Sequence, residues 1–348
     1  MLRSLDPSKD DYYQRLPKVE LHRHLEGSLR VDTMQDIARE YDIPLPKNTD
    51  FRGLVQVMDD DPPTFQNFLS KFDTLRKFYI SREVIQRIAY EAVEDAAADN
   101  VRYMEMIFTP VALARINGSP LGDVMDWVIE SVRKANADFN IQTRLIASAN
   151  RHESTDLAAE VIQLAVERKS HGIIGMNLVG NEAEFPAKPF LKIFQEAHRN
   201  GLSIALHAGE WAGAENVREA IEDFRAQRIG HGVRVLENNA VVELAQKSGV
   251  VFEVCPTSNY QSGVVRTWKD HPIKKMLEAG LNITVNTDDP GVSTISLSDE
   301  YRLVCEELDI SRTTLKGCIL SAAQAVFLPQ PEKDALIDQL KNELFTIN

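Results

Sequence analysis

The chain has 348 residues, of which 43% are hydrophobic, so it can bury a large core in one barrel-sized domain or two ordinary ones. Its 39 basic and 52 acidic residues give a formal net charge of -13, which disfavours a polyanionic partner such as a nucleic acid. We therefore expect a small-molecule partner and no nucleic acid.

The chain shows no feature of a membrane or secreted protein. It contains no run of eighteen apolar residues, and its first seventeen residues are charged and interrupted by proline. Its three cysteines, Cys255, Cys305 and Cys318, lack Cys-x-x-Cys spacing, which argues against a disulfide framework and a cysteine-based zinc site. We expect a cytoplasmic protein that does not bind a membrane.

Short apolar runs recur along the chain with amphipathic stretches between them, as is typical of repeated βα units. Eight runs have the length of strands: residues 19–22, 101–108, 142–147, 173–179, 203–207, 228–231, 250–254 and 282–286. The helical stretches are residues 81–98, 121–137, 155–169, 189–200, 214–225, 239–248 and 272–279. This α/β pattern predicts a single (β/α)8 TIM barrel domain over residues 1–348.

Extra helices are expected at two places. The first connection, residues 29–87, is longer than the others and contains helical stretches at 32–41 and 63–78. An insertion there could form a lid over the barrel mouth. Three more helical stretches, 299–308, 312–326 and 331–344, follow the eighth strand, and we expect them to pack against the barrel wall.

Polar side chains lie where several of these strands end, which is where barrel enzymes carry their reactive groups. His22 and His24 close the first strand, and period-two alternation sends both imidazoles to one side. His207 ends the fifth strand and Asp288 follows the eighth. Three imidazoles and a carboxylate suit one divalent ion with room for a water. We expect zinc, which lowers the pKa of bound water without redox chemistry, and leave cobalt, iron and manganese open.

Three further polar residues follow strand ends near this set. Glu210, three residues after His207, is well placed as a proton donor. His231 ends the sixth strand between two glycines, and we expect it to orient the attacking water or stabilise developing charge. Asp289 adjoins Asp288 and would point in a different direction, free to hold substrate.

Five motifs between Leu16 and Pro290 resemble, in this order, those of the adenosine deaminase family. They are Leu-Pro-Lys-Val-Glu-Leu-His-Arg-His-Leu-Glu-Gly-Ser, His-Ala-Gly-Glu, Arg-Ile-Gly-His-Gly-Val, Glu-Val-Cys-Pro-Thr-Ser-Asn and Asn-Thr-Asp-Asp-Pro. The resemblance implies a zinc-dependent aminohydrolase that removes the 6-amino group of an adenine-type purine. Its expected reaction converts adenosine and 2′-deoxyadenosine to the 6-oxopurine nucleosides, inosine in the case of adenosine, plus ammonia.

The resemblance also implies roles for individual residues. It implies that the zinc ligands are His22, His24, His207 and Asp288. Glu210 would protonate purine N1, His231 would position the attacking hydroxide, and Asp289 would contact N7. Gly180 corresponds to a glycine whose backbone meets N3. An apolar lid over the purine is implied for Phe65, Phe68, Leu69 and Phe72, for which plain core packing is the alternative.

Two clues to the substrate disagree. Adenosine-acting members often carry Asp where this chain has Glu26, and Glu resembles the adenine-acting branch and several bacterial members. The segment Leu-Val-Gly-Asn-Glu at 178–182 instead resembles the nucleoside-acting signature. We expect adenosine; the alternatives are adenine, a 5′-modified adenosine, N6-methyl-AMP and aminodeoxyfutalosine.

Three other classes of protein are weighed against this interpretation. A two-metal hydrolase would need a carboxylated lysine, and the fourth strand ends without one. The zinc deaminases with His-x-Glu and Pro-Cys-x-x-Cys motifs do not match, because Cys255 and Pro256 stand in the opposite order. A non-catalytic nucleoside-binding barrel is the most distant alternative, since every expected polar group is present.

Overall fold

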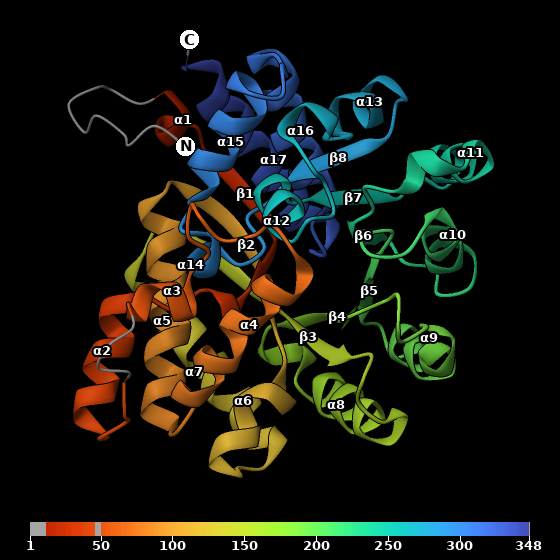
Figure 1. Ribbon diagram of the computed structural model, residues 1–348. Helices are drawn as coiled ribbons and strands as arrows, with labels where there is room; N and C mark the ends of the chain where they lie inside the picture. The colour runs from red at the N-terminus through yellow and green to blue at the C-terminus, as the bar shows by residue number, and fades with distance from the viewer. Residues whose placement is uncertain (1–11, 46–49, 348) are drawn as a thin grey trace.

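The backbone forms a barrel of eight parallel strands surrounded by helices (Figure 1). The computed structural model describes residues 12–45 and 50–347. In chain order around the barrel the strands are β1 (Lys18–His24), β2 (Val101–Phe108), β3 (Gln142–Asn150), β4 (Ile173–Val179), β5 (Ser203–Ala208), β6 (Arg228–His231), β7 (Val251–Val254) and β8 (Asn282–Val285). The predicted (β/α)8 barrel is confirmed. Most of the charged, proline-interrupted segment formed by the first seventeen residues lies outside the described residues.

An outer ring of helices covers the strands. The helices that connect successive strands are α5 (Arg82–Ala98), α7 (Leu121–Asp138), α8 (Thr155–Glu167), α9 (Leu191–Arg199), α10 (Ala214–Glu222), α11 (Asn239–Ser248) and α13 (Ile273–Glu278). After β8, α16 (Arg312–Ala325) packs on both β8 and β1 and completes the ring. Ser81, Ser154 and Ser311 cap α5, α8 and α16 by accepting a backbone N–H of the first turn.

Side-chain alternation along β1 sorts residues between the wall and the interior of the barrel. Val19 and Leu21 belong to an apolar cluster with Ala322 and Ala323 of α16, so they face outward. His22 and His24, at the alternate positions, therefore face inward. The sequence pattern alone predicted this shared side.

The barrel interior holds buried charges as well as apolar side chains. Arg228 on β6 is fully buried and forms ion pairs with Glu105 of β2 at 2.5 Å and Glu253 of β7 at 2.6 Å. The ring of Phe327 lies over the guanidinium group, with 3.6 Å between the ring centroid and Cζ of Arg228. Removing one member of such a group would leave an uncompensated charge in the interior. The network therefore fixes where the Glu253 carboxylate lies.

Residues just beyond β8 close the barrel against β1. The backbone N–H of Asp288 donates to the carbonyl of His22 at 2.9 Å, and the N–H of His24 donates to the carbonyl of Asp288 at 2.8 Å. The side-chain oxygen of Asn286 accepts the N–H of Leu21 at 2.9 Å. Closure in this register brings the Asp288 side chain beside the two histidines.

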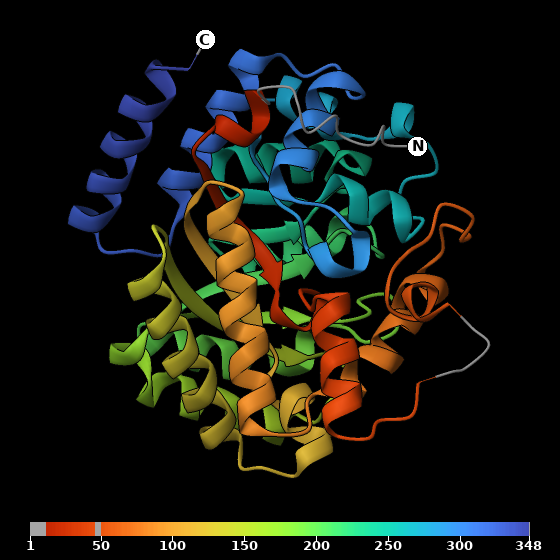
Figure 2. The same ribbon diagram turned by 90° about the vertical axis from the view of Figure 1, so that its left-hand side faces the viewer.

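The predicted extra helices are present after β1 and at the C-terminus. The insertion contains α2 (Val31–Glu40), α3 (Phe51–Val55) and α4 (Phe65–Leu75); α3 was not predicted. The tail contains α15 (Leu297–Glu306), α16 and α17 (Gln330–Phe345). In the side view α17, in dark blue, and the orange insertion lie at opposite ends of the barrel (Figure 2). In the described part of the chain, every helix is too short or too polar to cross a bilayer.

Three short helices that the sequence analysis did not predict begin with proline within five residues of a strand end. They are α6 (Pro110–Asn117), α12 (Pro256–Gln261) and α14 (Pro290–Ser293). Proline suits the first helical position because its backbone lacks an N–H and its φ is already helical. Each helix turns the chain soon after a strand and lies at the carboxyl end of the barrel.

Candidate active site

Four side chains from three distant parts of the chain converge at the carboxyl end of the barrel. Nε2 of His24 lies 3.4 Å from Nε2 of His207 and 3.3 Å from Oδ1 of Asp288. Nε2 of His22 lies 3.4 Å from the same Asp288 oxygen. One ligand atom from each of the four lies within 4.8 Å of those of the others. The sequence predicted this set, and the structure brings all four together.

The donor set fits a divalent metal ion. Nε2 of His22 is buried and has no hydrogen-bond partner among the described residues, which is costly unless it binds a ligand. Three imidazole nitrogens and one carboxylate oxygen are ligands that zinc favours, with a position left for water. The cluster could therefore hold one metal ion.

Neighbouring side chains fix the ring nitrogen that each ligand presents. Nδ1 of His22 donates to Oε2 of Glu253 at 2.7 Å, and Nδ1 of His207 donates to Oδ1 of Asn177 at 3.1 Å. Both rings then present Nε2 to the common centre. The Ser258 hydroxyl donates to Oδ2 of Asp288 at 2.7 Å, which leaves Oδ1 toward the histidines. None of these supporting roles was inferred from the sequence.

The glycine before His231 leaves room for the cluster. A Cβ atom at Gly230 would lie 2.8 Å from Cε1 of His22 and 3.1 Å from Nδ1 of His207. Any larger residue on this inward face of β6 would displace a metal-ligand candidate. Gly230, which the sequence suggested leaves space around His231, therefore also leaves space for His22 and His207.

Glu210 and His231 lie beside the four-residue cluster. Oε2 of Glu210 is 3.6 Å from Nε2 of His231, and that nitrogen is 3.8 Å from Oδ2 of Asp288. Both distances exceed a direct hydrogen bond but allow one atom to bridge the groups. Burial raises the pKa of the Glu210 carboxyl well above its usual range, and the charge of Asp288 raises it further. A neutral carboxyl group in this position can donate a proton.

The orientation of His231 is set by its backbone and by one amide. Its φ of 61° lies in the left-handed region, which non-glycine residues seldom occupy. Nδ2 of Asn259 donates to Nδ1 of His231 at 3.1 Å, so a neutral ring carries its proton on Nε2. Burial lowers the pKa of His231 to about 3. Its N–H therefore points toward Glu210 and Asp288.

Asp289 points away from its neighbour Asp288, as predicted. A Cβ atom at Gly27 would lie 1.8 Å from Oδ1 of Asp289, so only glycine at position 27 permits this orientation. That oxygen is buried and has no hydrogen-bond partner among the described residues. Burial raises the pKa of Asp289 well above its usual range, and the charge of Asp288 acts in the same direction.

Gly180 follows the end of β4, and Glu26 follows the end of β1 beside the histidine ligand candidates. Gly180 directly follows β4 with φ 101°, a conformation that a side chain would strain. The backbone N–H of Thr109 donates to Oε1 of Glu26 at 2.5 Å, while Oε2 is buried without a hydrogen-bond partner among the described residues. Burial raises the pKa of this carboxyl.

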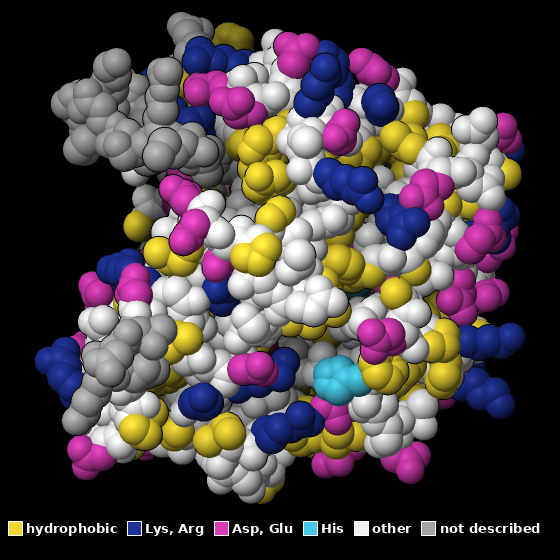
Figure 3. Space-filling model, viewed as in Figure 1, with side chains coloured by type: hydrophobic (Ala, Val, Ile, Leu, Met, Phe, Trp, Pro, Cys, Tyr) yellow, Lys and Arg dark blue, Asp and Glu magenta, His cyan; other side chains and the backbone are white. Residues whose placement is uncertain are grey.

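The inserted helix α4 contacts the loop after β1 and the loop after β5. It packs on the short helix formed by residues 25–27, and the ring of Phe65 lies 4.3 Å from that of Trp211. Phe68 is buried and Phe72 half-buried, with ring centroids 6.1 Å apart. Leu69 is 42% exposed and lies outside this apolar face. In the view of Figure 1, apolar and uncharged side chains cover much of the centre of the molecular surface (Figure 3).

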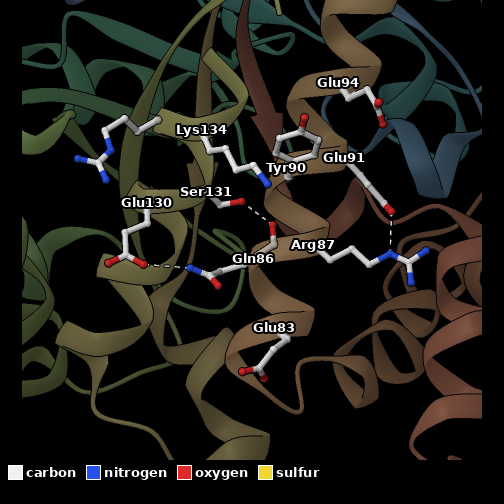
Figure 4. Close-up of a pocket in the computed structure, with 10 residues that line it drawn as sticks. Glu83, Gln86, Arg87, Tyr90, Glu91, Glu94, Glu130, Ser131 and Lys134 are labelled. Carbon is white, nitrogen blue, oxygen red and sulfur yellow. Dashed lines mark hydrogen bonds and ion pairs between the residues drawn. The ribbon is translucent and has the colours of Figure 1, made fainter. Parts of the chain in front are cut away.

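A separate hollow lies outside the barrel between α5 and α7 (Figure 4). Four of its polar side chains pair with one another: Nε2 of Gln86 donates to Oε2 of Glu130 at 3.0 Å, and Nε of Arg87 donates to Oε1 of Glu91 at 2.8 Å. Ser131 donates to the carbonyl of Gln86. The contacts of Gln86 with Glu130 and Ser131 join α5 to α7, and the Arg87–Glu91 pair lies within α5.

A parallel barrel with a cluster of possible metal ligands at the carboxyl ends of its strands is an architecture found in metal-dependent hydrolases. The family model described as adenosine deaminase matches residues 17–343. An adenosine deaminase of Erwinia tasmaniensis is 36% identical over 324 residues, which cover 92% of this chain and 97% of the relative. The chain belongs to the adenosine deaminase family, whose members are hydrolases that deaminate cyclic amidines.

Solved structures agree on the fold and carry different names. An adenine deaminase from Arthrobacter aurescens has TM-score 0.86 and 28% identity, covering 94% of this chain and 99% of its own. An N6-methyl-AMP deaminase from Arabidopsis thaliana has TM-score 0.84 and 29% identity, covering 95% and 98%. An amidohydrolase from Burkholderia ambifaria, with bound Zn, has TM-score 0.88 and 26% identity, covering 99% and 97%.

Proposed function

We propose that this chain is a zinc-dependent aminohydrolase that converts adenosine and 2′-deoxyadenosine to the 6-oxopurine nucleosides with release of ammonia. The observation that carries the proposal is the convergence of three Nε2 atoms and Oδ1 of Asp288 beside Glu210 and His231. Support for zinc comes from the donor set and from the structural relative with bound Zn. Support for adenosine comes from the relatives of that name at 33–36% identity.

In this proposal His22, His24, His207 and Asp288 hold the ion. A bound zinc ion supplies a water whose pKa is lowered toward neutrality, and thus a nucleophile for C6 of the purine. Glu210 carries a proton at neutral pH and donates it to N1. Protonation of N1 reduces the aromaticity of the ring and makes C6 electrophilic, a general-acid contribution of about 10²- to 10⁴-fold.

His231 and Asp289 have separate roles at the purine. The Nε2–H of His231 orients the attacking oxygen and stabilises the negative charge that develops on it. The neutral carboxyl of Asp289 donates to N7, and the backbone N–H of Gly180 donates to N3. Phe65, Phe68 and Phe72 of α4 cover the purine and exclude water. Of the two protons of the attacking water, one goes to the amino group, which leaves C6 as ammonia, and the other restores the Glu210 carboxyl. The product is the 6-oxopurine, with the donated proton on N1.

Glu26 is the residue that bears on the sugar. Thr109 anchors one of its oxygens, and the other has no partner among the described residues and is available to accept a hydroxyl group of ribose. A ribose hydroxyl would satisfy this buried oxygen, and free adenine offers no such hydroxyl. This favours adenosine over adenine, although the same residue resembles the adenine-acting branch.

The test follows ammonia release from adenosine, 2′-deoxyadenosine, adenine, 5′-deoxyadenosine, methylthioadenosine and N6-methyl-AMP. We expect the highest kcat/KM for adenosine. The variant Glu26→Gln should lower kcat/KM for adenosine more than for 5′-deoxyadenosine, because an amide is a weaker acceptor for the 5′ hydroxyl. Release of ammonia from adenine or N6-methyl-AMP, with none from adenosine, would contradict adenosine as the substrate and identify the compound that is turned over in its place.

A further inference from the structure

A buried carboxylate that the proposed chemistry does not use lies beneath the loop that carries Glu210. Glu182, three residues after β4, is 4% exposed. It accepts hydrogen bonds from the backbone N–H groups of Gly209, Glu210, Trp211 and Ala212 and from Nδ2 of Asn216. The donor–acceptor distances run from 2.6 to 3.0 Å. One carboxylate thus holds four consecutive peptide groups.

Consecutive N–H groups that point at one anion form a concave backbone site, and their conformation depends on that anion. The loop begins at Gly209, whose φ is 69°, and a Cβ atom there would lie 2.5 Å from Cγ2 of Val217. The chain therefore makes a tight turn directly after β5. The Glu182 carboxylate satisfies the N–H groups that this turn directs inward.

The loop joins three parts of the site. The metal-ligand candidate His207 lies just before it, and its carbonyl oxygen accepts a hydrogen bond from Nη2 of Arg151 at 2.5 Å. Glu210 lies within it. Trp211 follows and contacts Phe65 of α4 through ring centroids 4.3 Å apart. A displacement of the loop would therefore move the proton donor Glu210 and also Trp211, which contacts α4.

We propose that Glu182 is a positioning residue for this site. Its carboxylate holds the backbone of residues 209–212 so that the Glu210 carboxyl lies opposite Nε2 of His231. The proposal rests on the proposed role of Glu210 as proton donor. It assigns no contact between Glu182 and the substrate.

The substitution Glu182→Gln discriminates this role well, because it preserves size and removes half of the acceptor capacity. An amide oxygen can serve the donors of Oε1 or those of Oε2, while its NH2 group would face the remaining N–H groups. The loop must then shift away from one set of donors. A misplacement of about 1 Å at a reacting group can cost about 10²-fold in rate.

The experiment is a double-mutant cycle on the zinc-loaded enzyme with adenosine as substrate, comparing wild type, Glu182→Gln, Glu210→Gln and the double variant. We expect Glu182→Gln to lower kcat about 10²-fold with KM changed less than about 3-fold and with zinc content retained. In the Glu210→Gln background the same substitution should cost less than about 3-fold, because the group it positions is already disabled.

A matched control is Asp99→Asn, which makes the same chemical change in a carboxylate that accepts the backbone N–H of Ser298 at 2.9 Å, outside the site. Its kcat should equal that of wild type. Should Glu182→Gln not fold, Asn216→Ala takes its place: losing one donor predicts a roughly 3- to 10-fold loss of kcat that disappears in the Glu210→Gln background.

The outcomes separate this inference from the proposed function. If Glu182→Gln keeps the wild-type kcat while Glu210→Gln does not, the positioning role is overturned and the proton donor stands. Equal losses from Glu182→Gln in both backgrounds would also overturn it, since Glu182 would then act on the fold as a whole. If Glu210→Gln keeps full turnover, both assignments fail.

Discussion

Nε2 of His24 lies 3.4 Å from Nε2 of His207, although 183 residues separate them in the chain. The same His24 nitrogen lies 3.3 Å from Oδ1 of Asp288, and Nε2 of His22 lies 3.4 Å from that oxygen. Neutral imidazole nitrogens gain little from facing one another, whereas a cation between them binds every lone pair. We therefore propose that a bound metal ion stabilises the folded protein.

The first prediction is that purified protein contains about one zinc per chain and that its removal both abolishes turnover and lowers the thermal midpoint. His207→Ala should lose the metal. The exposed His171 supplies the control, because His171→Ala should leave metal content unchanged. Elemental analysis and thermal unfolding with and without a chelator make the comparison. Full metal content in His207→Ala would contradict the ligand set.

The second prediction concerns the buried carboxylate behind His22. Glu253 accepts the Nδ1–H of His22 at 2.7 Å and pairs with Arg228 at 2.6 Å. In Glu253→Gln one of these partners faces an NH2 group, so His22 loses its fixed orientation. We expect zinc affinity to fall about 10- to 100-fold in competition with a chelator.

The control for Glu253→Gln is Glu343→Gln, which changes a carboxylate that pairs with Arg102 at 2.9 Å on α17. Its zinc affinity should match that of wild type. Equal affinity in wild type and Glu253→Gln would show that His22 does not depend on Glu253 for its orientation.

The third prediction separates the two adjacent aspartates. Asp289→Ala should keep the metal, because Oδ1 of Asp289 lies against Gly27 rather than in the ligand cluster. It should lose the proton donor to N7, and we expect kcat/KM for adenosine to fall about 10²-fold or more. Metal content and steady-state kinetics are measured on the same preparation. Loss of zinc from Asp289→Ala, with zinc retained by Asp288→Ala, would reverse the two assignments.

The fourth prediction is a pH dependence of stability from a histidine outside the site. Burial lowers the pKa of His271 from 6.5 to about 3, and its Nδ1 accepts the N–H of Ile273 at 3.3 Å. As pH falls below 6.5 the unfolded chain takes up a proton that the folded protein does not, so stability is lost toward acid.

His271→Asn keeps an acceptor for Ile273 and removes the titration. Near pH 5 the free energy of unfolding of wild type should therefore drop by about 2 kcal/mol more than that of the variant, relative to their values near pH 8. Denaturant unfolding at the two pH values measures the difference. Parallel pH dependences would show that His271 is protonated in the folded protein.

The sequence predicted the barrel and the reactive residues because both follow from local patterns. Apolar runs marked all eight strands to within a few residues, and the rule that reactive groups follow strand ends selected His207, Glu210, His231 and Asp288 without any knowledge of contacts. The insertion after β1 was likewise visible as an overlong connection. The short helix α3 was missed because five residues carry too little periodicity to be recognised.

The supporting residues could not be predicted, because their partners come from other strands. Glu253 contacts His22 across 231 positions, and Glu182 contacts the loop at 209–212 only because β4 and β5 are neighbours. Glu253 did leave a signal: a charged residue in the apolar run of β7 must find a buried partner. The prolines at 110, 256 and 290 were a second signal, because each begins a helix within five residues of a strand end.

The most direct test of the account compares ammonia release from adenosine by wild type and Glu210→Gln of equal zinc content. The account predicts that wild type forms ammonia and inosine in equal amounts and that the variant, whose amide cannot deliver a proton to N1, is slower by about 10²-fold or more. Turnover by Glu210→Gln at the wild-type rate, or no ammonia from wild type with any 6-aminopurine, would contradict it.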